Sequence, residues 1–228
     1  MSDSITFDDA TPRNVQFGDT YFSKVDGRAE TSHVFIDCNN LPERWTDLIE
    51  DEPFVIGELG FGTGLNFLET ARQWKAGEHK GHLTFLSFEA FPMPSDDLLK
   101  SLEPWPDLSD GAKWLADQWP LPDGWNELSF EGVTLKIFIG DALLAVDDMT
   151  DTIDAWYLDG FAPSRNPELW EDSLLEKVCD LTRTGGTFAT YTSAGWVRRN
   201  LQAAGFDVVK FPGFGSKREM IRGHIPAA

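Results

Sequence analysis

The chain has little of several features that mark whole classes of protein. Only two of its 228 residues are cysteines, Cys38 and Cys179, and they form no C-x-x-C pair. This argues against a disulfide-stapled scaffold and indicates free thiols in a reducing cytoplasm. No apolar run approaches 18 residues and no basic segment precedes an apolar one near the start, so we expect neither a membrane span nor a signal peptide. His79 and His82 have no cluster of cysteines or carboxylates beside them, so we expect no metal site.

Basic residues are also scarce, at 19 Lys and Arg against 38 Asp and Glu, which gives a net charge of −19. Such a charge argues at first against a nucleic-acid partner. The distribution is uneven, however, because residues 165–228 hold 9 basic and 7 acidic side chains, whereas residues 1–164 hold 10 and 31. The late part of the chain is therefore either a nucleic-acid surface or an ordinary solvated one. Its basic residues include Arg165, Arg198, Arg199, Lys210, Lys217, Arg218 and Arg222.

Two common nucleotide-binding fingerprints are missing. No Gly-Lys pair occurs anywhere in the chain, which excludes a P-loop. The glycine-rich segment that starts at Gly60 has Leu65 where a dinucleotide fingerprint needs its third glycine, so the G-x-G-x-x-G match fails.

A glycine-rich turn that joins a predicted strand to a predicted helix is the most informative segment. Residues 54–59 form a short apolar run typical of a buried strand, and an apolar pattern that suits a helix follows the turn. Gly60, Gly62 and Gly64 allow positive φ and close approach of backbone N–H groups to a ligand. With Glu58 they form E-x-G-x-G-x-G, which resembles the first motif of class I S-adenosylmethionine-dependent methyltransferases. A tight turn in another α/β protein remains the alternative.

Two further acids follow predicted strands. Glu89 ends the strand 83–88, where a carboxylate can accept hydrogen bonds from ribose hydroxyls; the alternative is a capping or surface carboxylate. Asp141 follows the strand 133–139, at the position where this class of methyltransferase holds the adenine amino group; the alternative is a simple turn aspartate.

Strands that alternate with helices predict an α/β fold of the Rossmann-like, class I methyltransferase type. We expect a mostly parallel seven-stranded sheet in a single domain spanning residues 1–228. The last helix is predicted over 195–204, and the last two strands, 206–210 and 219–223, form an antiparallel hairpin. The remaining predicted strands cover 155–158 and 187–191.

Two additions to this fold are expected. In an N-terminal extension, residues 1–50, the runs 21–25 and 32–36 flank Asp26-Gly27 and predict a hairpin, followed by a short helix within 41–50. Residues 91–131 hold six prolines and four tryptophans and predict a helical insertion. Its tryptophans either stack on bases or pack a small lid.

The strongest chemical signal is the loop that begins at Asp159, at the end of the strand 155–158. Open α/β sheets carry their reactive groups at this edge. The acid-x-aromatic-x-Pro arrangement of Asp159, Phe161 and Pro163 resembles the D-P-P-[FY] loops of methyltransferases that alkylate amino groups of nucleobases. A carboxylate can orient an amine and stabilise the positive charge that develops on it, and Phe161 offers a flat face to a base or a cation.

Several segments together resemble one family. They are G-x-G-F-G-T-G-L-N, S-F-E-A-F-P, W-Y-L-D-G-F-A-P-x-x-N-P-x-x-W, T-S-A-G-x-V-R-R and the closing G-F-G-x-K-R-E-M. The family is the tRNA 5-methylaminomethyl-2-thiouridine methyltransferases, the N-terminal half of bifunctional MnmC proteins and its single-domain relatives. Fused members carry an FAD-dependent oxidoreductase. The chain has no dinucleotide fingerprint, so it resembles either a stand-alone enzyme or an excised domain, and we expect the oxidative half-reaction to be absent from it and to belong to a fused or separate partner.

The resemblance implies methyl transfer from S-adenosylmethionine to the aminomethyl group of 5-aminomethyl-2-thiouridine at the tRNA wobble position, in the cytoplasm. It implies that Asp159 is catalytic. The cofactor-binding residues it implies are Glu58, Gly60, Gly62, Thr63, Gly64, Asn66, Glu89, Ala90, Asp141 and Ala142. The substrate-binding residues it implies are Tyr21, Phe161, Arg165, Arg198, Arg199, Lys217 and Arg218.

Two other functions stay open at this point. One is the same chemistry on the amine of a small molecule or protein, which would not depend on the late basic residues. The other is a non-catalytic methyltransferase fold that only docks a partner, which the intact Asp159 and glycine turn argue against.

Overall fold

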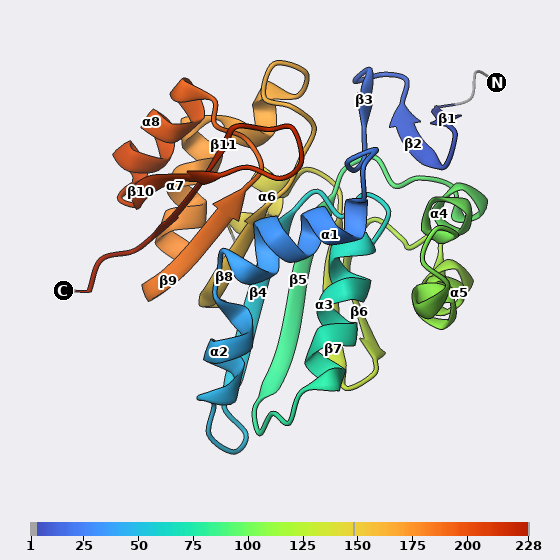
Figure 1. Ribbon diagram of the computed structural model, residues 1–228. Coiled ribbons are helices and arrows are strands. Elements are labelled where there is room, and N and C mark those ends of the chain that lie inside the picture. The colour runs from blue at the N-terminus through green and yellow to red at the C-terminus, as the bar shows by residue number, and fades with distance from the viewer. Residues whose placement is uncertain (1–3, 148, 228) are drawn as a thin grey trace.

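The computed structural model describes residues 4–147 and 149–227. Its centre is an eight-stranded sheet in the order β10-β11-β9-β8-β4-β5-β7-β6 (Figure 1). The strands are β4 (Pro53–Leu59), β5 (His82–Glu89), β6 (Gly124–Phe130), β7 (Val133–Ile139), β8 (Ile153–Leu158), β9 (Thr182–Thr190), β10 (Asp207–Pro212) and β11 (Glu219–His224).

The middle of the sheet is parallel, as the alternation of strands and helices predicts. Strand β4 pairs in parallel with β5 and β8, and the parallel set continues to β7 on one side and β9 on the other. The predicted C-terminal hairpin is confirmed, because β10 and β11 pair antiparallel and β11 also pairs antiparallel with β9. Parallel strands bring their carboxyl ends to one edge, so Glu89 and Asp159 lie at the same edge.

Helices cover both faces of the sheet. One face carries the N-terminal helices α1 (Gly27–Thr31), η1 (Ser32–Asp37, a π-helical segment) and α2 (Leu41–Thr46), together with α3 (Leu65–Ala76), α4 (Ser95–Leu102), η2 (Pro106–Leu108) and α5 (Ser109–Gln118). The other face carries α6 (Ala142–Val146), α7 (Asp172–Leu181) and α8 (Gly195–Ala204), and the 3₁₀ turn η3 (Pro167–Trp170) precedes α7.

Strand β4 shows how the sequence sorts side chains between these layers. Phe54 and Ile56 are buried towards α3, whereas Gly57 faces the opposite layer. A Cβ on Gly57 would lie 2.6 Å from the ring of Trp156, so glycine leaves the space that this fully buried indole fills. Burying a side chain of this size stabilises the fold by about 2–3 kcal/mol.

The hairpin predicted for residues 21–36 is wrong. Residues 27–37 are helical as α1 and η1, and the hairpin of the N-terminal extension lies earlier, where β1 (Ile5–Asp8) pairs antiparallel with β2 (Thr11–Asn14) and β2 with β3 (Asp19–Thr20). The apolar run around Phe35 is a buried helical segment whose ring stacks on Tyr157 at 4.9 Å. A short apolar run fits a buried helix as well as a strand, and packing decides between them. The helix expected within 41–50 is present as α2.

The insertion predicted over 91–131 is only partly helical. Helices α4, η2 and α5 occupy its first part, but residues 124–130 form β6, which pairs antiparallel with β7 and adds an eighth strand to the seven expected. The tryptophans of the helical part pack: Trp119 stacks on Phe61 at 5.7 Å, and Trp114 contacts Phe67. Trp125, by contrast, lies outside the helical part and is exposed on the edge strand β6.

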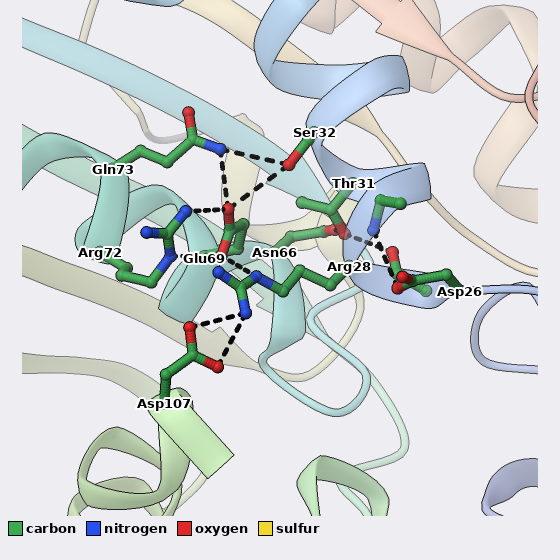
Figure 2. A network of polar contacts seen from close by, with 11 residues as sticks. Asp26, Arg28, Thr31, Ser32, Asn66, Glu69, Arg72, Gln73 and Asp107 are labelled. Carbon is green, nitrogen blue, oxygen red and sulfur yellow. Dashed lines mark hydrogen bonds and ion pairs between the residues drawn. The ribbon is translucent and has the colours of Figure 1, made fainter. Parts of the chain in front are cut away.

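A buried carboxylate attaches the N-terminal helices to α3 (Figure 2). Glu69 of α3 is 1% exposed and accepts hydrogen bonds from Arg28 of α1 and from Arg72 and Gln73 of its own helix. Arg28 also pairs with Asp107 of η2 at 2.7 Å. Buried charges need such paired and hydrogen-bonded surroundings. The network holds α1 against the first turns of α3, next to the cavity described below.

Candidate active site

A cavity of about 680 Å³ lies at the carboxyl ends of the parallel strands. Its walls come from the glycine turn after β4, from the loops after β5, β7 and β8, from residues 19–23 with α1, and from the loop between β10 and β11. In Figure 1 the N-terminal strands β1–β3 lie above this edge on the right, whereas β10 and β11 form the end of the sheet on the left. The volume is typical of a site for a small-molecule ligand.

The glycine turn packs directly onto the neighbouring strands. Gly60, Gly62 and Gly64 all have positive φ, as predicted. A Cβ on Gly60 would lie 2.2 Å from the Asp159 carbonyl oxygen, so this position excludes any side chain. The N–H groups of Gly60 and Phe61 both donate to the Phe88 carbonyl, at 3.0 and 3.1 Å. The turn is therefore fixed to both β5 and β8.

Glu89 is held rigidly by two backbone N–H groups. One carboxylate oxygen accepts from Gly62 and the other from Phe91, each at 2.7 Å. Burial raises the pKa of Glu89, and these two hydrogen bonds oppose that rise. The carboxylate keeps further acceptor capacity towards the cavity, whose lining includes Glu89 and Ala90.

Asp159 lies at the end of β8 and lines the cavity. Its Oδ2 accepts a hydrogen bond from Asn66 Nδ2 at 2.7 Å. Burial raises the pKa of Asp159 to about 7, with smaller contributions from the negative charges of Glu30 and Asp19, while Asn66 and Lys217 act in the opposite direction. The carboxyl group therefore changes its charge near neutral pH.

The same amide connects Asp159 to a second, fully buried carboxyl group. Asn66 Nδ2 also donates to Glu58 Oε1 at 2.9 Å, and Ser87 donates to the other Glu58 oxygen at 2.6 Å. Burial raises the pKa of Glu58 well above its usual range. Thr31 donates to Asn66 Oδ1 at 2.6 Å, which fixes the orientation of the amide (Figure 2). Glu58 lies beneath Asn66 and is not part of the cavity wall formed by the described residues.

Aromatic rings form one wall beside Asp159. Phe161 stacks on Phe17 with ring centroids 4.7 Å apart, and Tyr21 meets it edge-on at 5.1 Å. Phe17 also contacts Phe91, which is 48% exposed. The Tyr21 hydroxyl accepts a hydrogen bond from Asn14 at 3.0 Å. These contacts hold the ring of Phe161 in a fixed position at the cavity.

Lys217 reaches the cavity from the loop between β10 and β11. Its Nζ pairs with Glu30 of α1 at 2.9 Å and lies 4.2 Å from the centre of the Tyr191 ring. Tyr191 in turn donates to the Gly160 carbonyl at 2.6 Å. Lys217 thus connects the C-terminal hairpin to α1 across the cavity.

The structure brings most of the predicted site residues to one cavity. The predicted residues that line it are Tyr21, Gly60, Gly62, Thr63, Asn66, Glu89, Ala90, Asp141, Ala142, Asp159, Phe161 and Lys217. Those outside its lining are Glu58, Gly64, Arg165, Arg198, Arg199 and Arg218. Asp141 also caps α6, because its Oδ1 accepts from the Leu143 N–H at 2.9 Å.

Several acidic residues of the cavity were missed from the sequence. Asp19 and Glu30 come from the N-terminal extension, and Glu168 and Glu171 from η3 and its end. No local motif identifies them, because only tertiary packing brings these segments to the strand ends. Asp19 also holds the loop after β8, since its Oδ2 accepts from the Ala162 N–H at 2.8 Å.

Among residues 4–147 and 149–227, no group of three or more His, Cys, Asp or Glu side chains is arranged to hold a metal ion. None of the helices formed by these residues has the length and apolar character needed to cross a bilayer.

Comparison with known proteins gives a family and a set of relatives. Residues 106–226 match the family model described as S-adenosyl-L-methionine-dependent methyltransferase. Proteins named "tRNA 5-methylaminomethyl-2-thiouridine biosynthesis bifunctional protein MnmC" are similar over nearly the whole chain. The one from Stutzerimonas stutzeri is 43% identical over 95% of this chain and 34% of its own length. The one from Marinobacter nauticus is 44% identical over 98% of this chain and 37% of its own length. The one from Chromohalobacter salexigens is 46% identical over 92% of this chain and 31% of its own length. The chain thus spans about a third of the length of these relatives.

Among solved structures, MNMC2 from Aquifex aeolicus superposes with a TM-score of 0.78 at 23% sequence identity, covering 96% of this chain and 68% of the other. This likeness confirms the methyltransferase-type fold.

Proposed function

The chain belongs to the S-adenosyl-L-methionine-dependent methyltransferase family, and from this premise we propose that it methylates the aminomethyl group of 5-aminomethyl-2-thiouridine at the wobble position of tRNA. The product is 5-methylaminomethyl-2-thiouridine. The names of relatives that are 43–46% identical over more than nine-tenths of the chain support this substrate. The residues of the cavity support methyl transfer to an amine.

S-adenosylmethionine is the cofactor, and the residues of the cavity fit it. Gly62 leaves space at the cavity wall, where a Cβ would lie 3.1 Å from the Tyr21 ring, and Glu89 presents a carboxylate held by two N–H groups. We assign Gly60, Gly62, Thr63 and Asn66 to its methionine part. Glu89 with Ala90 is assigned to the ribose, and Asp141 with Ala142 to the adenine. When bound, the cofactor supplies an electrophilic methyl group on a positively charged sulfur.

The observation that carries the proposal is the charge of the cavity lining. Seven carboxylic acids line it, Asp19, Glu30, Glu89, Asp141, Asp159, Glu168 and Glu171, against a single basic residue, Lys217, among the described residues. A negative cavity concentrates cations and repels phosphates. A sulfonium and a protonated aminomethyl group are both cations, so the lining suits the two reactants.

Asp159 can lower the cost of freeing the amine. An aminomethyl group with a lysine-like pKa of about 10 must lose a proton before it can attack a methyl group. Moving this proton to an ordinary aspartate costs about 8 kcal/mol, but the pKa of Asp159, raised to about 7, reduces the cost to about 4 kcal/mol. Asn66 and the strand end hold the carboxylate in place, so the amine that it binds has a defined direction of attack.

The rest of the function follows from the substrate. A wobble-position substrate implies tRNA as partner and the cytoplasm as location, with Tyr21 and Phe161 beside the target base. Arg198, Arg199 and Arg218 are proposed phosphate contacts. The relatives are called bifunctional, which supports a fused or separate FAD-dependent oxidoreductase acting on the preceding step. We propose a single methyltransferase domain over residues 1–228.

Nucleoside analysis tests the proposal. Hypomodified tRNA carrying 5-aminomethyl-2-thiouridine is incubated with the protein and methyl-labelled cofactor, then digested and separated. We expect label in 5-methylaminomethyl-2-thiouridine. Label in no nucleoside, in a protein that binds the cofactor, would contradict the proposal and favour a different amine as substrate. Matched tRNA that lacks the aminomethyl group is the control.

A further inference from the structure

Two arginines converge outside the acidic cavity. Arg13 lies on β2 and Arg165 in the loop that follows Asp159. A Cβ on Gly18 would lie 2.9 Å from Arg165 Nη1 and 3.7 Å from Arg13 Nη2, so both guanidinium groups meet at the turn between β2 and β3. Arg13 Nη2 donates to the Gly18 carbonyl at 2.6 Å.

Neither arginine has an acidic partner within ion-pair distance among the residues that the structure describes. Arg28 and Arg72, by contrast, both pair with Glu69. Two like charges held together repel each other, and an anion bound between them offsets this repulsion. Guanidinium groups match the oxygens of a phosphate.

The pair lies next to the reaction site. Gly18 directly precedes Asp19, which lines the cavity and accepts a hydrogen bond from the Ala162 N–H. On the other side of Gly18, Phe17 stacks on Phe161 of the same loop. The arginines are therefore at the edge where the N-terminal extension meets the loop of Asp159.

We infer that Arg13 and Arg165 bind a phosphodiester that flanks the target nucleotide while its base and aminomethyl group enter the cavity. The inference rests on the proposed function. It separates the charges of the substrate: the cationic amine enters a negative cavity, and the anionic backbone stays on two arginines at its edge. Single-stranded loops such as an anticodon loop can splay out one base in this way. Arg13 thereby becomes a substrate-binding residue that no sequence motif suggests.

Phosphate neutralisation tests this inference. The probe is an anticodon stem-loop RNA with 5-aminomethyl-2-thiouridine, in which the phosphate 5′ or 3′ of that nucleotide is replaced by an uncharged methylphosphonate. We expect one replacement to weaken binding to the wild type by about tenfold. The Arg13→Ala/Arg165→Ala protein should bind the RNA that keeps all its phosphates about tenfold more weakly than the wild type does. Its binding should no longer change when that phosphate is replaced.

The matched control is Lys75→Ala/Lys177→Ala, which also removes two positive charges, from surface ion pairs with Glu131 and Asp147 outside the cavity lining. It should keep the full sensitivity to the replaced phosphate. Arg165→Ala alone is a second variant, since the Arg165 side chain makes no hydrogen bond within the described structure. Unchanged cofactor affinity by calorimetry shows that the variants are folded.

Two outcomes separate the two proposals. Wild-type protein that does not methylate this RNA overturns the proposed function. If the wild-type protein does methylate this RNA, the proposed function stands and the arginine site is tested separately. The arginine site is overturned if neither phosphate replacement weakens binding, or if the Arg13→Ala/Arg165→Ala protein is as sensitive to the replacement as the wild type.

Discussion

Asn66 Nδ2 lies 2.7 Å from Asp159 Oδ2 and joins the first turn of α3 to the end of β8. The same nitrogen donates to the buried Glu58, so one amide connects the carboxyl group at the reaction site to one beneath it. Because Thr31 fixes the amide oxygen, both N–H groups of Asn66 are directed at carboxylates.

This arrangement predicts that Asn66→Ala shifts the pH dependence of methyl transfer. The lost hydrogen bond stabilises the ionised form of Asp159, so its removal should raise the pKa of Asp159 further and move the acid limb of the pH–rate profile up by about one unit. Steady-state rates between pH 5.5 and about 9 measure it. Ser87→Ala is the control, because Ser87 donates only to Glu58. An unmoved acid limb at saturating cofactor would mean that the hydrogen bond from Asn66 does not set the pKa of Asp159.

The glycine turn gives a second prediction. Gly62 has φ +56°, and a Cβ there would lie 3.1 Å from the Tyr21 ring, so Gly62→Val should narrow the cavity and weaken cofactor binding by at least about tenfold. Gly132→Val is a matched control. It also has positive φ, at +82°, but a Cβ there meets nothing within 4 Å. Calorimetry that finds the same cofactor affinity in folded Gly62→Val protein and wild type would remove Gly62 from the cofactor site.

The main features of the site could be predicted because each follows a strand. Gly60 and Asp159 come directly after β4 and β8, and Glu89 is the last residue of β5. Parallel strands bring their carboxyl ends together whatever the details of packing. The position of the Glu58 side chain could not be predicted from the strand end alone, because it depends on which of the two helical layers each residue of β4 faces. Glu58 faces Asn66 and Ser87.

The errors in the fold have a common cause. The run around Phe35 was predicted as a strand because its apolar residues are consecutive, yet it is the buried face of a helical segment. Residues 124–130 were included in a helical insertion because of their tryptophan and proline neighbours, yet they form an edge strand with little buried surface. Burial of one face depends on contacts distant in the sequence, which local patterns do not contain.

Asp159 should also make the protein less stable at high pH. Its folded-state pKa, about 7, is above the unfolded value of 3.8, so folding takes up a proton between these values and the free energy of unfolding falls as the pH rises through this window. Asp159→Asn has no charge to lose. We therefore expect its melting temperature to exceed that of the wild type by about 2–4 °C or more at pH 8, a difference of at least about 1 kcal/mol. The gain should shrink towards pH 4.

Thermal unfolding without cofactor at the two pH values measures this effect. A gain of equal size at pH 4 and pH 8 would show that the carboxylate of Asp159 is not destabilised by its surroundings. The same result would weaken the argument that its raised pKa lowers the cost of freeing the amine.

The rate of methyl transfer by Asp159→Asn tests the central claim most directly. The measurement is made on hypomodified tRNA at saturating cofactor over a range of pH, with calorimetry to show that cofactor affinity is unchanged. We predict a rate about 10²-fold or more below the wild type at pH 7. The deficit should shrink at higher pH, because the wild-type rate levels off above about pH 7 while the variant gains from the growing fraction of neutral amine. A wild-type rate for Asp159→Asn at pH 7 would contradict the account, since the carboxylate would then only support the structure of the loop.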